Sequence, residues 1–193
     1  MSRQGLCISI RTNQPIGEGA ILIIMKNATL LFLIKKIPGG VVDICLAMKK
    51  RGFGKGRYNG VGGKVEEGES ILDAVKREAQ EEIEVVVGEV TKCAELNFTF
   101  PHEPSFDQLV HVYTTESWEG EPRETDEMSP SWLSTSYIPY EQMWPDDIFW
   151  LPLVLEGKKI RGRFVFGEGD VVKEHEVTTV SYTHLTLPTN REV

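Results

Sequence analysis

The sequence predicts an α/β fold of the α+β type, with a mixed β-sheet sandwiched between helices, and three observations support this. Segments rich in β-branched and aromatic residues, which favour strands, recur along most of the chain. One long segment, residues 70–83, places apolar residues at helical spacing, and segments with helical character follow at 139–143 and 146–155. Strands, a long helix, further strands and a second helix are typical of a sheet that packs helices on its faces.

Each expected strand is a run of apolar residues bounded by Gly, Pro or polar residues. The expected strands are 29–35, 41–49, 85–90, 93–100, 108–115, 131–133, 159–166 and 171–180. The long helix should begin at Ser70, because Ser70 followed by Asp73 is typical of a helix N-terminus. Loops are expected at 51–63, 101–105 and 116–130.

The length of 193 residues indicates one domain with short extensions. Residues 1–19 are polar and carry no periodic signal, so we expect them to be a loose leader before a domain at 20–180. Residues 181–193 have neither periodicity nor a packing face, and we expect a disordered or non-native tail there.

The apolar stretch 20–34 is interrupted by Lys26 and Asn27. Each apolar half is far shorter than the ~20 residues that a membrane helix needs. The stretch also lacks the basic start and small-residue cleavage site of a secretory signal. We therefore interpret it as a strand, a turn and a second strand, and we expect no membrane association.

Charge and cysteine usage exclude several classes of protein. The net charge of -8 and the pI of about 5.1 disfavour a nucleic-acid polymer as partner, because proteins that track phosphates are usually basic. Cys7, Cys45 and Cys93 are odd in number and lack metal-site spacing, which indicates a reducing compartment without disulfides. The histidines have no spacing that suggests a zinc site or a Ser/His triad. We expect a cytoplasmic monomer.

The helix after Ser70 carries three glutamates, Glu78, Glu81 and Glu82, at i, i+3 and i+4. Residues at this spacing are neighbours on a helix, so these carboxylates repel one another unless a cation lies between them. Hard oxygen ligands of this kind suit Mg²⁺ or Mn²⁺. The opposite face is expected to be apolar, and its residues are Ile71, Leu72, Val75, Ala79 and Ile83. A solvated acidic helix is the alternative interpretation.

This segment resembles the Nudix box, GX5EX7REUXEEXGU, in which U is a bulky aliphatic residue. The matching residues are Gly63, Glu69, Arg77, Glu78, Glu81, Glu82 and Val85. Ala79 stands at the first U, and Glu84 stands where the box has Gly. The resemblance implies a Nudix hydrolase that cleaves a diphosphate linkage, whereas the substrate depends on other segments.

Three further segments, 48–69, 126–128 and 143–150, resemble the Nudix hydrolases that act on oxidised purine nucleoside triphosphates. The likeness extends over about residues 29–180. It implies hydrolysis of substrates of the 8-oxo-dGTP and 2-hydroxy-dATP type to the monophosphate and pyrophosphate, with Mg²⁺ or Mn²⁺ as cofactor. Such an activity would sanitise the nucleotide pool.

The resemblance also implies roles for individual residues. Positions matching the metal site and the catalytic residues are Gly63, Arg77, Glu78, Glu81, Glu82 and Glu127. Positions matching the substrate pocket are Lys49, Asn59, Val61, Gly62, Gly63, Lys64, Phe98, Met128, Trp144, Pro145, Asp146, Asp147 and Trp150. Among them, Asn59 and the two aspartates match residues that bind the purine edge, and Trp144 matches the residue that stacks on the base. The general base stays open among Glu78, Glu81 and Glu127.

Asp146 and Asp147 also support an argument from their own chemistry. Two adjacent carboxylates in an apolar, Trp-rich setting cannot easily both ionise, so one should keep a proton and offer a donor beside an acceptor. Such a pair suits the changed hydrogen-bonding edge of an oxidised purine. The alternative is that both aspartates cap the following helix.

Glu84 is the departure from the box. If it adopts the left-handed conformation of the family Gly, it costs roughly 1–2 kcal/mol, and its charge lies at the negative end of the helix dipole. We expect reduced stability or altered turnover rather than loss of activity, because every box carboxylate is present.

Several alternatives stay open on the residues alone. The chain could be a Nudix hydrolase of another nucleotide class, or a non-catalytic Nudix module that binds a nucleotide or protein. Trp144, Trp150 and Phe98 could be ordinary core aromatics, and Lys49 could be one of several surface cations.

Overall fold

The fold is seen in a computed structural model that describes residues 25–180, and the expected leader 1–19 and tail 181–193 lie outside the described residues. The strands are β1 Lys26–Ile37, β2 Gly40–Lys49, β3 Tyr58–Asn59, β4 Val86–Val87, β5 Thr91–Thr99, β6 Gln108–Thr115, β7 Trp118–Glu119, β8 Met128–Ser134, β9 Ile160–Phe166 and β10 Val172–Thr179. The α-helices are α1 Ile71–Ile83 and α2 Asp147–Leu155, and short 3₁₀ helices are Pro104–Phe106, Thr135–Tyr137, Tyr140–Gln142 and Glu168–Asp170.

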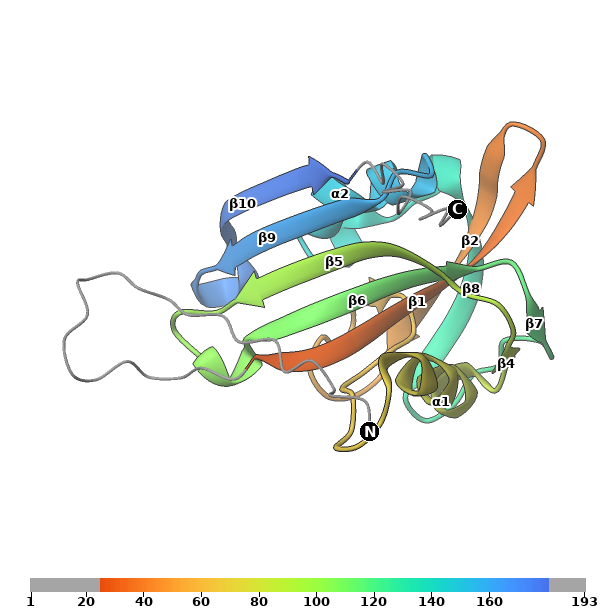
Figure 1. The fold of residues 1–193 in the computed structure, drawn as a ribbon, viewed down its shortest axis with the longest axis horizontal. Helices are drawn as coiled ribbons and strands as arrows, with labels where there is room; N and C mark the ends of the chain where they lie inside the picture. The colour runs from red at the N-terminus through yellow and green to blue at the C-terminus, as the bar shows by residue number, and fades with distance from the viewer. Residues whose placement is uncertain (1–24, 181–193) are drawn as a thin grey trace, which may run out of the picture.

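The main sheet is mixed, as expected. Its order is β10-β9-β5-β6-β1-β2-β3, with β8 also paired to β2, and the first five of these strands lie across the view in Figure 1. β1 is parallel to β6 and antiparallel to β2, while β5 is antiparallel to β6 and parallel to β9. β4 and β7 form a separate two-stranded sheet beside α1.

Successive residues of β1 contribute in turn to two hydrophobic cores, because neighbouring residues of a strand point to opposite faces of the sheet. Leu30 and Phe32 belong to the core that includes Trp150 of α2, whereas Leu31 and Leu33 belong to the core that contains the buried residues of α1. The sheet is thus covered by one helix on each face, which confirms the sandwich.

Several expected elements differ from the structure. Lys26 and Asn27 are not in a turn: they lie within β1 and pair with β6, because the parallel partner strand extends β1 toward its start. The short pair Tyr58–Asn59 of β3, expected as loop, pairs with the end of β2. Segment 85–90 forms a strand only at Val86–Val87.

The acidic segment expected as a loop at 116–130 contains β7 and the start of β8. β8 is longer than the expected strand 131–133, because its pairing with β2 runs from Asp43 to Lys49 along that strand. The expected helical segment 139–143 is a 3₁₀ helix at Tyr140–Gln142. Tertiary pairing extends strands beyond the range that local composition indicates.

None of the helices formed by residues 25–180 has the length and apolar character that crossing a membrane requires.

Candidate active site

Helix α1 begins as the sequence predicts. The Ser70 hydroxyl accepts a hydrogen bond from the Asp73 backbone N–H at 3.1 Å and donates one to the Asp73 carboxylate at 2.6 Å. Val75, Ala79 and Ile83 are buried against β1. Leu72, expected on the apolar face, is exposed, since α1 meets the sheet along a narrower stripe than the sequence pattern indicates.

The three helix glutamates have different environments. The Glu81 side chain is 59% exposed, Glu78 is half-buried and Glu82 is buried. Burial, opposed by the neighbouring Arg77, raises the pKa of Glu78, and the charges of Glu82 and Glu81 contribute. Helical spacing therefore places the three carboxylates together, whereas the packing of the sheet determines how much water each one meets.

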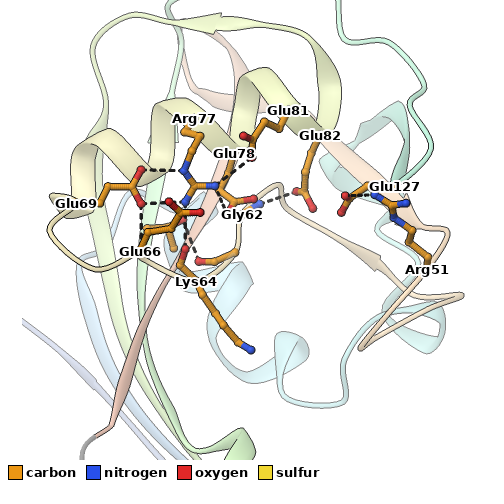
Figure 2. Close-up of polar contacts among 12 residues, drawn as sticks. Arg51, Gly62, Lys64, Glu66, Glu69, Arg77, Glu78, Glu81, Glu82 and Glu127 are labelled. Carbon is orange, nitrogen blue, oxygen red and sulfur yellow. Dashed lines mark hydrogen bonds and ion pairs between the residues drawn. The ribbon is translucent and has the colours of Figure 1, made fainter.

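Arg77 is the cation between two of these carboxylates, those of Glu78 and Glu81. Its guanidinium donates to Glu69 at 2.8 and 2.9 Å, to Glu78 at 2.8 Å and to Glu81 at 3.0 Å, and Figure 2 shows it in the middle of this group. It also donates to the Lys64 carbonyl at 3.1 Å. The hydrogen bond from Arg77 lowers the pKa of Glu69. Arg77 thus connects α1 to the loop that precedes it.

Glu82 lies on the same side of α1 as Glu78, beside the loop that contains Gly62 and Gly63. One carboxylate oxygen accepts from Lys49 Nζ at 2.9 Å. The other accepts from the Gly62 backbone N–H at 2.8 Å, a contact that Figure 2 shows. Gly62 has φ of 154°, and a Cβ there would lie 2.1 Å from the Thr29 carbonyl oxygen, so only glycine permits this approach. Lys49 is accordingly bound to the acidic helix rather than being one of several free surface cations.

Glu127 reaches the same region from the position just before β8. Its carboxylate accepts from Arg51, and this hydrogen bond lowers the pKa of Glu127 (Figure 2). The neighbouring Lys50 donates to Glu124 and to the Thr125 carbonyl. Two cations just beyond the end of β2 therefore hold the acidic segment 124–127 against that end of the strand.

A divalent cation fits the chemistry of this donor set. Within residues 25–180, no three His, Cys, Asp or Glu side chains converge in the arrangement of a metal site. Glu78, Glu82 and Glu127 each accept a hydrogen bond from a cation, namely Arg77, Lys49 and Arg51 respectively. The Glu78 carboxylate nevertheless packs on Gly63, where a Cβ would lie 2.5 Å from its oxygen. All these donors are oxygens, and all of these carboxylates line one cavity, which suits a hard cation.

Asp146 and Asp147 are both buried at the start of α2. Asp146 makes no side-chain capping bond: its carboxylate accepts from Trp150 Nε1 at 2.8 Å, while the Asp147 carboxylate accepts from the Trp144 backbone N–H at 3.1 Å. The helix-capping interpretation is therefore wrong for Asp146. Burial raises the pKa of Asp146 to about 6, and burial together with the Asp146 charge raises the pKa of Asp147 well above its ordinary value.

Aromatic side chains form the wall beside these aspartates. Trp144 contacts the Phe53 ring at 4.8 Å between centroids, and the Arg57 guanidinium lies 4.7 Å from the indole centroid. Phe100 stacks on Phe166 at 4.8 Å with an interplanar angle of 12°. Aromatic rings therefore form much of the surface at this end of the site, beside the buried carboxylates.

One cavity of about 800 Å³ joins the acidic helix to the aromatic wall. The residues expected at the site that line it are Lys49, Asn59, Gly62, Gly63, Lys64, Arg77, Glu78, Glu82, Phe98, Glu127, Met128, Trp144, Asp146, Asp147 and Trp150. Glu81, Val61 and Pro145 are not among its lining residues. Val61 is buried and exchanges backbone hydrogen bonds with Leu31, because it lies in the bridge that joins the loop to β1.

Other lining residues were not expected from the sequence, and they include Thr29, Arg51, Phe53, Phe100, Gln108 and Phe166. Phe100 and Gln108 lie at facing ends of β5 and β6, and alternation along β5 from Phe98 could have indicated Phe100. No local pattern distinguishes Gln108 or Phe166 from other strand residues.

Glu84 ends α1 in the left-handed conformation, with φ of 59° and ψ of 34°. Its N–H donates to the Gln80 carbonyl at 3.2 Å, and the next N–H, that of Val85, donates to the Ala79 carbonyl at 3.4 Å. The bond from the Glu84 N–H to the Gln80 carbonyl is the 5→1 bond of an αL C-cap, in which glycine is usual. Glu84 thus has the left-handed conformation to which the expected strain cost applies.

Comparisons with known proteins agree with this architecture. The family model of the NUDIX domain matches residues 18–154. The chain is 43% identical over 155 residues to the oxidized purine nucleoside triphosphate hydrolase of Danio rerio, which covers 80% of this chain and 96% of that protein. It is 42% identical over 137 residues to the Mus musculus protein of the same name, covering 71% and 87% respectively.

Among solved structures, the mMutator MutT protein from Bacillus halodurans has a TM-score of 0.68 at 21% sequence identity, covering 79% of this chain and 97% of that one. This likeness concerns the fold alone. Since the family model spans most of the chain and the curated relatives align over most of their own length, the chain belongs to the Nudix family.

Proposed function

We propose that this chain hydrolyses oxidised purine nucleoside triphosphates to the monophosphate and pyrophosphate. One observation carries the proposal: a single cavity has a carboxylate-rich end at α1 and, at its other end, two buried aspartates within an aromatic wall. The first suits a triphosphate with its metal, and the second suits a purine edge. The names of the curated relatives from Danio rerio and Mus musculus support the same substrate class.

At the phosphate end of the cavity, the chain contributes both acidic and basic side chains. Glu78 and Glu82, with the Gly63 carbonyl, are the residues that would hold a divalent cation, and we propose Mg²⁺ or Mn²⁺. A cation bound there would offset phosphate charge and lower the pKa of the attacking water. Nudix hydrolases generally use divalent cations. Lys49 and Arg51, which line the same end, are placed to bind phosphate oxygens.

Arg77 orients the acidic cluster in this proposal. By holding Glu69, Glu78 and Glu81 at once, its guanidinium keeps the Glu78 carboxylate beside Gly63. Glu81 is exposed and lies outside the cavity lining, so the geometry favours Glu78 and Glu127 as the groups that accept the proton of the attacking water.

At the base end, the raised pKa values of Asp146 and Asp147 would keep a proton on the pair to a higher pH than exposed carboxyl groups keep one. A protonated carboxyl donates and its ionised neighbour accepts, so the pair can match the altered donor and acceptor pattern of an oxidised purine. Asn59 adds an amide to this end, and Trp144 supplies an indole surface for the base.

We also propose a cytoplasmic monomer without nucleic-acid polymer or membrane partners. The support is the acidic net charge of -8 together with Cys45 and Cys93, which are buried free thiols.

The test is pyrophosphate release with Mg²⁺ from 8-oxo-dGTP, 2-hydroxy-dATP, O6-methyl-dGTP and dGTP. We expect a higher kcat/KM for a modified purine than for dGTP. Glu78→Gln should lower kcat by about 10²–10⁴-fold, as loss of a catalytic carboxylate does, while the exposed Glu89→Gln should match the wild type.

Equal turnover of all four nucleotides would be consistent with a Nudix hydrolase but would contradict the proposed preference for oxidised purines. Absence of turnover with every nucleotide would favour a binding module instead.

A further inference from the structure

The connection between β5 and β6 places an aromatic side chain at the mouth of the cavity. Its 3₁₀ helix, Pro104–Phe106, ends in Phe106, whose ring is 4.7 Å from the Phe53 ring and 6.0 Å from the Phe100 ring between centroids. Phe106 is 43% exposed and is not itself a lining residue, whereas Phe53 and Phe100 are. It therefore contacts the wall of the cavity from outside.

The backbone around Phe106 is held on both sides. The buried Asp107 carboxylate accepts from the Phe100 N–H at 2.7 Å, and the Phe106 N–H donates to the Glu103 carbonyl at 3.0 Å. Lys26 Nζ, at the start of β1, donates to the Ser105 carbonyl at 3.1 Å. The connection is thus tied to both β5 and β1, and these contacts fix the position of Phe106 beside the Phe53 ring.

The backbone around Phe53 is less constrained than the backbone around Phe106. It lies between Gly52 and Gly54, which have φ of 73° and 80°, and it is 45% exposed. Glycine on each side leaves the local torsions free, so the place of the ring depends on the rings that it contacts. Those rings are Trp144 at 4.8 Å, Phe106 at 4.7 Å and Phe100 at 6.2 Å.

We propose that Phe106 is a positioning residue for substrate affinity: it holds Phe53 against Trp144 and so completes the apolar rim that the nucleobase meets. The inference rests on the proposed function. Phe106 acts through Phe53 and does not touch the reacting atoms. The rim is apolar, and the buried aspartates lie elsewhere in the cavity. Loss of the Phe106 ring should therefore weaken the binding of all purine triphosphates alike rather than change the preference among them.

The experiment is a double-mutant cycle with Phe106→Ala, Phe53→Ala and both together, read as kcat and KM for 8-oxo-dGTP and dGTP. We expect Phe106→Ala to raise KM by about 2- to 12-fold, the fold-change corresponding to one aromatic pair, with kcat unchanged. The ratio of kcat/KM between the two nucleotides should stay constant. In the Phe53→Ala background, Phe106→Ala should have no further effect on KM.

Two variants control for folding. Phe106→Tyr keeps the ring with its hydroxyl toward water and should retain the wild-type KM, even if Phe106→Ala lowers the melting temperature. Tyr137→Ala removes an exposed aromatic side chain outside the cavity lining and should change neither kinetic constant.

An active wild type whose KM is unchanged by Phe106→Ala would overturn this inference alone. It would also be overturned if Phe106→Ala raised KM equally with and without Phe53, because the effect would then not pass through that ring. A wild type inactive on every purine triphosphate would overturn the proposed function and this inference together, and the wild-type assay itself would reveal that case.

Discussion

Asp146 and Asp147 are adjacent, yet they accept hydrogen bonds from different donors, the Trp150 indole and the Trp144 backbone. Both side chains are buried, and desolvation disfavours their charged forms. Burial raises the pKa of Asp146 from 3.8 to about 6, and burial together with the Asp146 charge raises the pKa of Asp147 well above the same ordinary value. The consequence is a dependence of stability on pH.

The sign follows from proton binding. Between pH of about 4 and 6, folded Asp146 retains a proton that the unfolded chain has released, so the free energy of unfolding falls as pH rises through this window. Asp146→Asn keeps an acceptor for Trp150 and removes the charge. We expect the stability of this variant, relative to wild type, to increase by about 1–3 kcal/mol from pH 4 to pH 7.5.

Urea unfolding of both proteins at several pH values measures this difference. Asp147→Asn should change in the same direction. Parallel stability curves for the wild type and Asp146→Asn would show that burial does not retain the proton.

Among the elements, the C-terminus of α1 joins the acidic helix to the segment that leads to β8. Besides the C-cap formed by Glu84, the Arg123 N–H donates to the Ile83 carbonyl at 3.0 Å. Arg123 also lies 3.9 Å from the Glu84 carboxylate, but both side chains are exposed, so this pair contributes little. The left-handed backbone of Glu84 is therefore the main local cost.

Glu84→Gly should raise the free energy of unfolding by about 1 kcal/mol, because relief of left-handed strain exceeds the added entropy of an unfolded glycine. The melting temperature should rise by about 2–4 °C. Glu84→Gln, which removes the charge and keeps the strained side chain, should recover only a minor part of this. Equal gains in Gly and Gln variants would assign the cost to the helix dipole instead.

Across the molecule, the cavity collects residues that are far apart in sequence. β2 contributes Lys49, α1 contributes Glu78 and Glu82, and α2 contributes Asp147, while the chain between β7 and β8 contributes Glu127. The sheet makes this possible because β1 has a core on each face and joins both halves. Anything that binds across the cavity should therefore stabilise the fold as a whole.

Magnesium should have this effect. If Mg²⁺ binds the acidic cluster of the folded chain but not the unfolded chain, its binding adds to the free energy of unfolding. The melting temperature should then rise by about 2–4 °C for each kcal/mol that is added. EDTA should reverse the rise and abolish pyrophosphate release. Thermal unfolding with Mg²⁺, compared with NaCl at equal ionic strength, measures this. A similar rise in Glu78→Gln/Glu82→Gln would place the stabilising cation elsewhere.

Local sequence signals predicted the elements whose residues interact mainly with near neighbours. Ser70 begins α1 and residues 108–115 form β6 with the expected bounds. The β3 pair at Tyr58–Asn59 escaped prediction because it lies among glycines and forms only by pairing with β2. Leu72 was assigned to the apolar face, but periodicity along a helix does not say how wide a stripe its partner covers.

The spacing of residue types along the chain was sufficient to predict a Nudix protein that has every carboxylate of the box. It also showed that the helix ends in a residue other than glycine. Both are properties of the order of residues, which the sequence specifies directly. The folded molecule was needed to learn that Glu82 is buried while Glu81 faces water, and that the Phe106 ring contacts Phe53. Burial and ring contacts depend on segments distant in sequence, and local spacing carries no information about which of them meet.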